Sequence, residues 1–203
     1  ILQVTIGCSH NRCTFCGMYT TKRFRARTAG EIQADIDACR AMLGPGVRRV
    51  FLADGDAMCL STHRLIAILD QINDAFPSLQ RIGIYANARD VLSKTDEDLA
   101  ALRSRKLRML YIGLESGDPK TLAAIDKPAT PGEIVESVQR ARRAGMSTSV
   151  MVLIGLAGAE RSLEHARLSA EAINEMVPDF TGLLTYTPVP GTPHYERIAS
   201  GQA

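Results

Sequence analysis

The feature that most constrains the fold of this chain is a regular recurrence of short apolar runs rich in β-branched residues. The runs begin roughly every 27 to 46 residues, which leaves room for a helix between successive strands and is too long for hairpins. The six predicted strands are Gln3–Ile6, Arg49–Ala53, Arg81–Ala86, Arg108–Leu114, Ser149–Ile154 and Phe180–Thr185. Alternating strands and helices predict a parallel sheet with right-handed crossovers.

The segments between these runs carry helix signals. Thr28–Glu31 and Thr130–Glu133 are capping-box patterns, in which the first side chain and the fourth residue's carboxylate satisfy free N–H groups. Gly44 and Gly145 mark the ends of these two helices. Apolar residues at helical spacing predict three further helices, over 65–76, 95–105 and 163–177. Every predicted strand except the last is therefore followed by a helix.

Polar or glycine-rich residues follow nearly every predicted strand, which favours a barrel over a doubly wound sheet. A (β/α) barrel gathers the carboxyl ends of its strands around one mouth, where its sites lie. A doubly wound dinucleotide-binding sheet would place a GxGxxG pattern after its first strand, and this pattern is absent here. The sequence thus predicts α/β architecture, as a partial, open (β/α)6 TIM-like barrel with a parallel sheet.

Composition sets outer limits on the function. The 203 residues fit one domain, 1–203, and both ends look cut, so we interpret the chain as the core of a longer protein. A net charge of +2 gives no clear nucleic-acid signal. No apolar run reaches the roughly 18 residues of a membrane helix, so no membrane association is expected. Five cysteines, three of them clustered, favour the reducing cytoplasm over a secreted disulfide framework.

Three cysteines lie close together directly after the first predicted strand: Cys8, Cys13 and Cys16. Thiolates this dense usually share zinc or an iron–sulfur cluster. A [4Fe–4S] cluster bound by three thiolates leaves one iron open for a non-protein ligand. The alternative is a zinc-binding structural or interaction module, with His10 or a distant residue as fourth ligand. A third interpretation is a phosphate-handling barrel enzyme in which these cysteines are incidental.

Several motifs in order resemble the core of the radical S-adenosylmethionine (radical SAM) superfamily. They are the cysteine triad and the stretches YIGLESGDPKTL, IGLAG and TPVPGTPHYE, and the likeness runs from Gln3 to Pro193. These stretches look typical of the branch that includes oxygen-independent coproporphyrinogen oxidases, methylthiotransferases and cobalamin-dependent members. One departure is the spacing: the family usually has CxxxCxxC, whereas this chain has Cx4Cx2C.

The resemblance implies a cofactor pair and a reaction. The three cysteines would bind a [4Fe–4S] cluster, and the methionyl amine and carboxylate of S-adenosylmethionine (SAM) would chelate the fourth iron. One electron, from a donor such as flavodoxin or ferredoxin, would then split SAM into methionine and a 5′-deoxyadenosyl radical, which abstracts hydrogen from a substrate. An enzyme of this kind is oxygen-sensitive.

The resemblance also implies roles for residues near the triad. Phe15 matches the aromatic position that approaches the adenine of SAM. The turn Asp54, Gly55 and Asp56 stands where the family has Gly-Gly-Glu, which receives the SAM ammonium, and a carboxylate there can accept a cationic amine. The simpler alternative is that Asp54 and Asp56 have a purely structural role, in a turn and cap at the end of the strand.

Further positions carry over after the later strands. Glu115 and Ser116 match the ribose contacts, with a solvated strand end as the alternative for Glu115. Lys127 matches a basic residue that faces the SAM carboxylate, although a lone lysine is more often at the surface. The remaining predicted cofactor contacts are Gly155 and Gly158, beside the adenine, and Asn87 and Arg89, beside the SAM carboxylate or the substrate. Gly155 and Gly158 also simply permit a tight turn.

Other residues receive only a structural interpretation. Lys22, Arg23, Arg25 and Arg27 form a basic run that would face an acidic substrate or a reductant, but such loops are usually just solvated. Cys39 and Cys59 are expected in the core.

Overall fold

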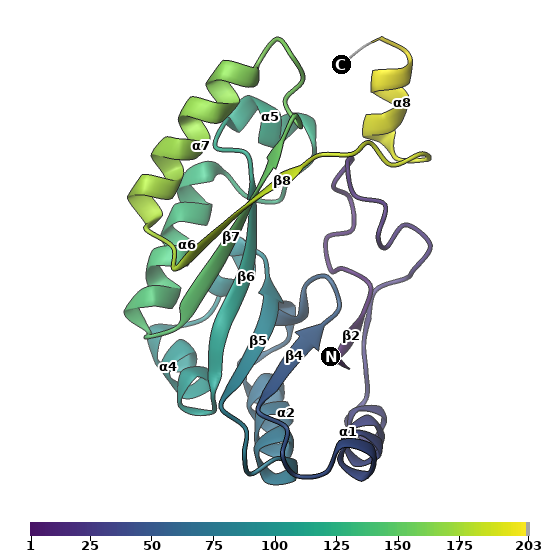
Figure 1. Cartoon of the computed structure of the whole chain (residues 1–203), viewed down its shortest axis with the longest axis vertical. Coiled ribbons are helices and arrows are strands. Elements are labelled where there is room, and N and C mark those ends of the chain that lie inside the picture. Colours follow the sequence, from purple (N-terminus) through teal and green to yellow (C-terminus); the bar gives the residue numbers. More distant parts are fainter. Residues whose placement is uncertain (202–203) are drawn as a thin grey trace.

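The computed structural model describes residues 1–201 and has the predicted α/β architecture (Figure 1). Six strands form one sheet in the order β1-β4-β5-β6-β7-β8, and all neighbouring pairs are parallel. The strands are β1 (Leu2–Gln3), β4 (Arg49–Ala53), β5 (Arg81–Ala86), β6 (Leu107–Glu115), β7 (Ser147–Ile154) and β8 (Phe180–Thr185). Because spatial order follows chain order, the sheet winds in one sense, as in a barrel. The prediction of a partial barrel-like fold is confirmed.

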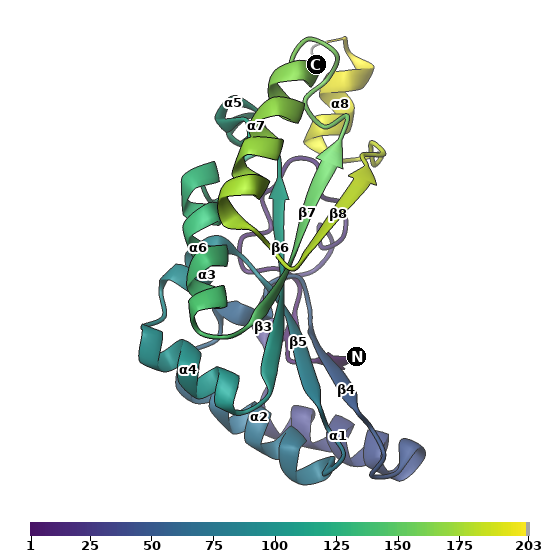
Figure 2. The ribbon, with the colours of Figure 1, turned by 60° about the vertical axis from the view of Figure 1, so that its left-hand side comes forward.

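The connections between strands are mostly helical, and α4, α6 and α7 lie along one face of the sheet (Figure 2). The helices are α1 (Ala29–Leu43), α2 (Thr62–Ala75), α3 (Ala88–Leu92), α4 (Asp96–Ser104), α5 (Pro119–Ala124), α6 (Pro131–Arg143), α7 (Ser162–Met176) and α8 (Pro193–Ala199), with a 3₁₀ turn η1 (Ala57–Cys59). Within residues 1–201, no helix is both long and apolar enough to cross a bilayer.

The core forms where the apolar stripes of the helices meet the sheet. Ile32, Leu69 and Ile134, from α1, α2 and α6, are fully buried, as are Leu52 and Leu110 from β4 and β6. Burying such a side chain contributes about 1.5–3 kcal/mol, and this continuous cluster fixes the ends of the strands relative to one another.

Both predicted capping boxes are present. In α1 the Glu31 N–H donates to the Thr28 hydroxyl at 3.2 Å, and the Thr28 N–H donates to the Glu31 carboxylate at 2.7 Å. Thr130 and Glu133 form the same pair of bonds at the start of α6. The two capping-box patterns therefore predicted the helix starts correctly, because each pattern depends only on residues within one turn of helix.

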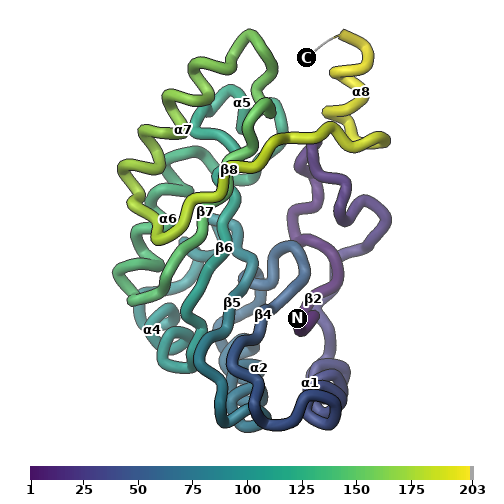
Figure 3. Tube along the Cα trace, viewed as in Figure 1, coloured from purple at the N-terminus to yellow at the C-terminus, as the bar shows by residue number. Residues whose placement is uncertain are grey.

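Two expectations need correction. The first predicted strand, Gln3–Ile6, is split: β1 pairs with β4, whereas β2 (Thr5–Ile6) pairs antiparallel with β3 (Arg25–Ala26). The last strand is also followed by a helix, α8. The chain trace in Figure 3 shows α8 on the same side of the sheet as the segment between β2 and β3.

Candidate functional site

Cys8, Cys13 and Cys16 all lie on one loop, residues 7–24, which we call the cysteine loop. The antiparallel pair β2–β3 holds the two ends of this loop together, with Ile6 opposite Arg25. All three thiols are free and half-buried. The structure thus brings the predicted metal ligands onto a single segment between β2 and β3.

The cysteine loop accommodates the unusual Cx4Cx2C spacing at Asn11. This residue adopts a left-handed conformation with φ of 48°, which asparagine tolerates better than most residues. Its side-chain amide donates to the Tyr19 carbonyl at 3.0 Å. Farther along, the Cys16 N–H donates to the Cys13 carbonyl at 3.0 Å and closes a tight turn. The first interval therefore bulges while the second stays compact.

Burial raises the pKa of the Cys13 thiol to about 11, although the nearby Lys127 ammonium opposes part of the rise. Burial likewise raises the pKa of Cys16. Since a thiol must lose its proton to bind a metal, loading this loop releases protons. Three soft sulfur donors on one loop, with a lysine beside them, suit a cofactor whose bound state carries negative charge.

The turn Asp54–Asp56 lies against the start of the cysteine loop. Asp54 Oδ2 accepts hydrogen bonds from the Gly7 N–H and from Gln3 Nε2, both at 3.0 Å. Asp56 accepts from the Ser9 hydroxyl with one oxygen, and from the Asn87 N–H at 3.2 Å with the other. If the carboxyl ends of the strands formed an open mouth, both carboxylates would be exposed to water. Instead, Asp54 is only 8% exposed and Asp56 is fully buried.

Arg89 completes this polar group. Its guanidinium donates to the Ser9 hydroxyl at 2.5 Å and to Asp90 at 3.2 Å, and it lies 3.7 Å from Asp56. Asn87 is the residue before α3, and its backbone N–H donates a hydrogen bond to the Asp56 carboxylate. The structure therefore brings Asp56, Asn87 and Arg89 together around Ser9, a residue that sequence reasoning did not single out.

Glu115 and Lys127 form an ion pair beside the triad. Lys127 Nζ donates to Glu115 Oε1 at 2.9 Å, and the two side chains are only 8% and 13% exposed. Burial lowers the pKa of Lys127, but the charge and hydrogen bond of Glu115 together with the charges of Cys13 and Cys8 outweigh burial, so that the pKa lies above its ordinary value. Lys127 is thus not a surface lysine. It supplies a fixed positive charge next to Cys13.

Ser116 points elsewhere. Its hydroxyl is fully buried, bonds His165 Nδ1 on α7 at 2.8 Å, and accepts from the Asp118 N–H at 3.0 Å. The side chain is therefore engaged between β6 and α7, and of the predicted ribose pair it is Glu115 that lies beside the triad. The ribose contact itself stays a prediction.

Phe15 packs against the core and meets Tyr186 edge to face, with ring centroids 6.4 Å apart. Tyr186 in turn contacts His194 at 5.2 Å, at the start of α8. The His194 N–H donates to the Thr14 carbonyl at 3.0 Å. Sequence reasoning missed Tyr186 and α8 as neighbours of the triad, because no local signal links residues so far apart.

Gly155 and Gly158 form the turn after β7, with positive φ values of 90° and 68°. They line a pocket of about 560 Å³ together with residues of α5 and α8. Ile125, which also lines this pocket, accepts a hydrogen bond at 2.9 Å from the Thr14 N–H of the cysteine loop. The two glycines thus share a pocket with a residue that bonds the cysteine loop, and their contact with the adenine stays a prediction.

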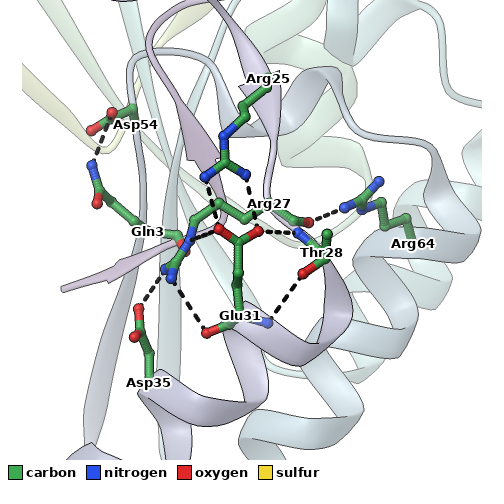
Figure 4. A network of polar contacts seen from close by, with 8 residues as sticks. All are labelled: Gln3, Arg25, Arg27, Thr28, Glu31, Asp35, Asp54 and Arg64. Atoms are coloured by element: carbon green, nitrogen blue, oxygen red, sulfur yellow. Dashed lines mark hydrogen bonds and ion pairs between the residues drawn. The ribbon is translucent and has the colours of Figure 1, made fainter.

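The basic run has a structural role that the sequence did not indicate. Arg25 forms a two-pronged contact with Glu31, at 2.9 and 2.7 Å, and Arg27 bonds Asp35 and the Gln3 carbonyl (Figure 4). Arg25 and Arg27 therefore connect β3 to α1 and are not simply solvated.

Comparisons with known proteins identify the family of the chain. The sequence matches the family model of the Radical SAM superfamily over residues 2–168. It is 24% identical over 194 residues to an uncharacterised protein of Methanopyrus kandleri and 23% identical over 199 residues to an uncharacterised methyltransferase of Pyrococcus horikoshii. These alignments cover 89% and 97% of the chain, but only 36% and 41% of the relatives. The chain thus spans about two fifths of their length.

Solved structures share the fold. Methylornithine synthase superposes with a TM-score of 0.72 and 19% identity, covering 96% of this chain and 55% of that one. A radical SAM methyltransferase from Kitasatospora setae, solved with cobalamin and a [4Fe–4S] cluster, gives 0.75 and 20%, covering 98% and 39%. The family match extends over most of the chain. The protein therefore belongs to the radical SAM superfamily, a family of enzymes.

Proposed function

We propose that Cys8, Cys13 and Cys16 bind a [4Fe–4S] cluster with one open iron, and that the chain uses it to cleave SAM reductively. The observation that carries the proposal is the set of three half-buried thiols on one loop beside the buried Lys127. When bound, the cluster would supply the electron that splits SAM into methionine and a 5′-deoxyadenosyl radical, and this radical would abstract hydrogen from a substrate.

The residues around the triad would hold SAM as follows. Asp54 Oδ1 accepts no hydrogen bond from residues 1–201, so it can receive the SAM ammonium together with the Gly55 carbonyl. Glu115 can accept from a ribose hydroxyl, while Lys127 faces the SAM carboxylate, with Asn87 and Arg89 as further candidates.

The adenine would lie among Phe15, Gly155 and Gly158. An aromatic ring gives it an apolar contact, and two residues without side chains leave room for its approach. An external one-electron donor, such as flavodoxin or ferredoxin, is required. We place the enzyme in the cytoplasm, where five free cysteines stay reduced, and expect it to be oxygen-sensitive.

A zinc module is the competing proposal, and the donor arrangement gives it no support. Zinc–sulfur bonds of about 2.3 Å in a tetrahedron bring the sulfurs within about 4 Å of one another. Among residues 1–201, no group of three or more His, Cys, Asp or Glu side chains is arranged to hold one metal ion. A cluster would instead give each thiolate its own iron atom, so the three sulfurs would not need to surround one metal ion.

Anaerobic reconstitution tests the proposal. The wild-type chain should bind about four irons and show the broad visible absorption of a [4Fe–4S] cluster. Replacing Cys8, Cys13 or Cys16 singly by alanine should abolish it, whereas Cys39→Ala, on α1, is the matched control and should retain it. A colourless wild-type chain with one zinc ion would refute the proposal.

A further inference from the structure

The turn after β4 contacts the segment around Cys8 residue by residue. Asp54 accepts from the N–H of Gly7, the residue before Cys8, at 3.0 Å. The Gly55 N–H donates back to the Gly7 carbonyl at 3.2 Å. Asp56 accepts from the hydroxyl of Ser9, the residue after Cys8. The first metal ligand is therefore flanked on both sides by bonds to one turn.

The middle residue of the turn lies directly against Cys8. A β-carbon added to Gly55 would stand 3.1 Å from the Cys8 β-carbon and 2.4 Å from the Tyr19 ring, so only glycine lets the turn approach this closely. Cys8 thus packs on the Gly55 backbone while its two neighbours are hydrogen-bonded to the flanking acids.

Both carboxylate oxygens of Asp56 already accept hydrogen bonds from the protein. The side chain is fully buried. One oxygen accepts from Ser9, the other accepts from the Asn87 N–H, and Arg89 lies 3.7 Å away as the charge partner. A SAM ammonium at Asp56 would have to share these oxygens with the donors already in place. This separates Asp56 from Asp54, which keeps a free oxygen.

We infer that Asp56 is a positioning residue for Cys8, acting through the Ser9 hydroxyl. Ser9 donates to Asp56 and accepts from Arg89 at 2.5 Å, so its side chain is fixed between the residues that follow β4 and β5. This inference rests on the proposed function, in which Cys8 binds the cluster, and it assigns Asp56 to the ligand loop rather than to SAM.

The unusual loop spacing gives a reason for such positioning. The interval between Cys8 and Cys13 holds one residue more than the usual family pattern, and within it Asn11 is exposed and has a left-handed φ of 48°. Each added residue increases the conformational freedom that the loop loses when its ends are fixed. Contacts that hold Cys8 before loading reduce that loss.

The test uses the metal-free chain, so that it does not depend on activity. Iodoacetamide alkylation of each cysteine is followed by mass spectrometry in wild type, Asp56→Asn, Ser9→Ala and the double variant. Losing a hydrogen bond to a charged group should speed alkylation of Cys8 by about ten- to a hundredfold, with Cys13 little changed. Because both residues act through one bond, the double variant should be no faster than the faster single variant.

Asp118→Asn is the matched control. Asp118 is also a buried carboxylate that accepts from a backbone N–H and a hydroxyl and pairs with an arginine, but these partners, Thr121 and Arg161, lie outside the cysteine loop. It should leave Cys8 alkylation unchanged. If Cys8, Cys13 and Cys16 were alkylated faster by the same factor in the Asp56 and Ser9 variants and also in Asp118→Asn, the substitutions would be loosening the whole fold. That result would overturn the inference.

A second readout separates Asp56 from a SAM ligand. After anaerobic reconstitution, Asp56→Asn should lose iron faster than wild type and broaden the electron paramagnetic resonance signal of the reduced cluster. Unchanged Cys8 reactivity with weakened SAM binding would refute positioning and return Asp56 to the SAM site. Failure of the wild-type chain to bind a cluster would refute the proposed function but would leave the alkylation result standing.

Discussion

Replacing Lys127 with methionine should destabilise the metal-free chain strongly. The substitution keeps an unbranched apolar side chain that lacks only the terminal ammonium position, but leaves Glu115, which is 13% exposed, without its partner at 2.9 Å. At that distance the attraction is on the order of 6 kcal/mol for an effective dielectric constant of about 20, and desolvation offsets part of it. Leaving one member of a buried pair unpaired typically costs about 3–5 kcal/mol. We expect a loss in that range in the free energy of unfolding.

The double variant Lys127→Met with Glu115→Gln is the control for this prediction. It removes both charges, so no uncompensated carboxylate remains buried, and its stability should return to within about 1 kcal/mol of wild type. Urea denaturation of the wild type, Lys127→Met, Glu115→Gln and the double variant under anaerobic, metal-free conditions gives the coupling energy between the two sites. A loss below about 1 kcal/mol in the single variant, or a double variant no more stable than the single one, would refute a buried pair.

Two further predictions concern stability. Gly117→Ala should lower the free energy of unfolding, measured by urea denaturation, by about 3 kcal/mol or more, because the new β-carbon would stand 2.2 Å from the Leu168 carbonyl oxygen. Gly30→Ala is the control: its β-carbon would meet nothing within 4 Å, so the substitution should be neutral or slightly stabilising. The hydrogen bonds from Arg161 hold the pKa of Asp118 well below its usual range, so this carboxylate stabilises the fold above about pH 4 and the stabilisation is lost as pH falls. Asp118→Asn should flatten the fall in the free energy of unfolding between pH 7 and pH 3; an unchanged slope would contradict this account.

Three strands could be predicted with their exact bounds because their signal is local. The runs Arg49–Ala53, Arg81–Ala86 and Phe180–Thr185 match the strands of the structure at both ends. The split of Gln3–Ile6 could not be predicted in this way. A two-residue pairing of Thr5 and Ile6 with a segment some 20 residues later leaves no periodic pattern, and short helices such as α8 leave no apolar stripe long enough to detect.

The candidate site likewise contains residues whose association the sequence predicted and residues whose association it could not predict. The three cysteines are close in the sequence, so their association was readable from spacing alone. The partners of Asp56 were not, because Ser9 and Arg89 lie 47 and 33 positions away and only the sheet brings them together. The strand-end position of Asp56 suggested an open mouth, but the cysteine loop covers this turn. Burial there depends on tertiary packing, which composition and spacing do not encode.

The cysteine loop is held at its start, middle and end by different parts of the fold. Asp54 binds its first residue, Gly7, and the Ile125 carbonyl accepts from Thr14 between the second and third cysteines. At the far end, Arg25 is fixed to α1 through Glu31. Fixing a residue costs about 1–2 kcal/mol of conformational entropy, and here folding meets that cost before any metal arrives. The loop is therefore preorganised, so that more of the free energy of ligand binding remains for holding the cofactor.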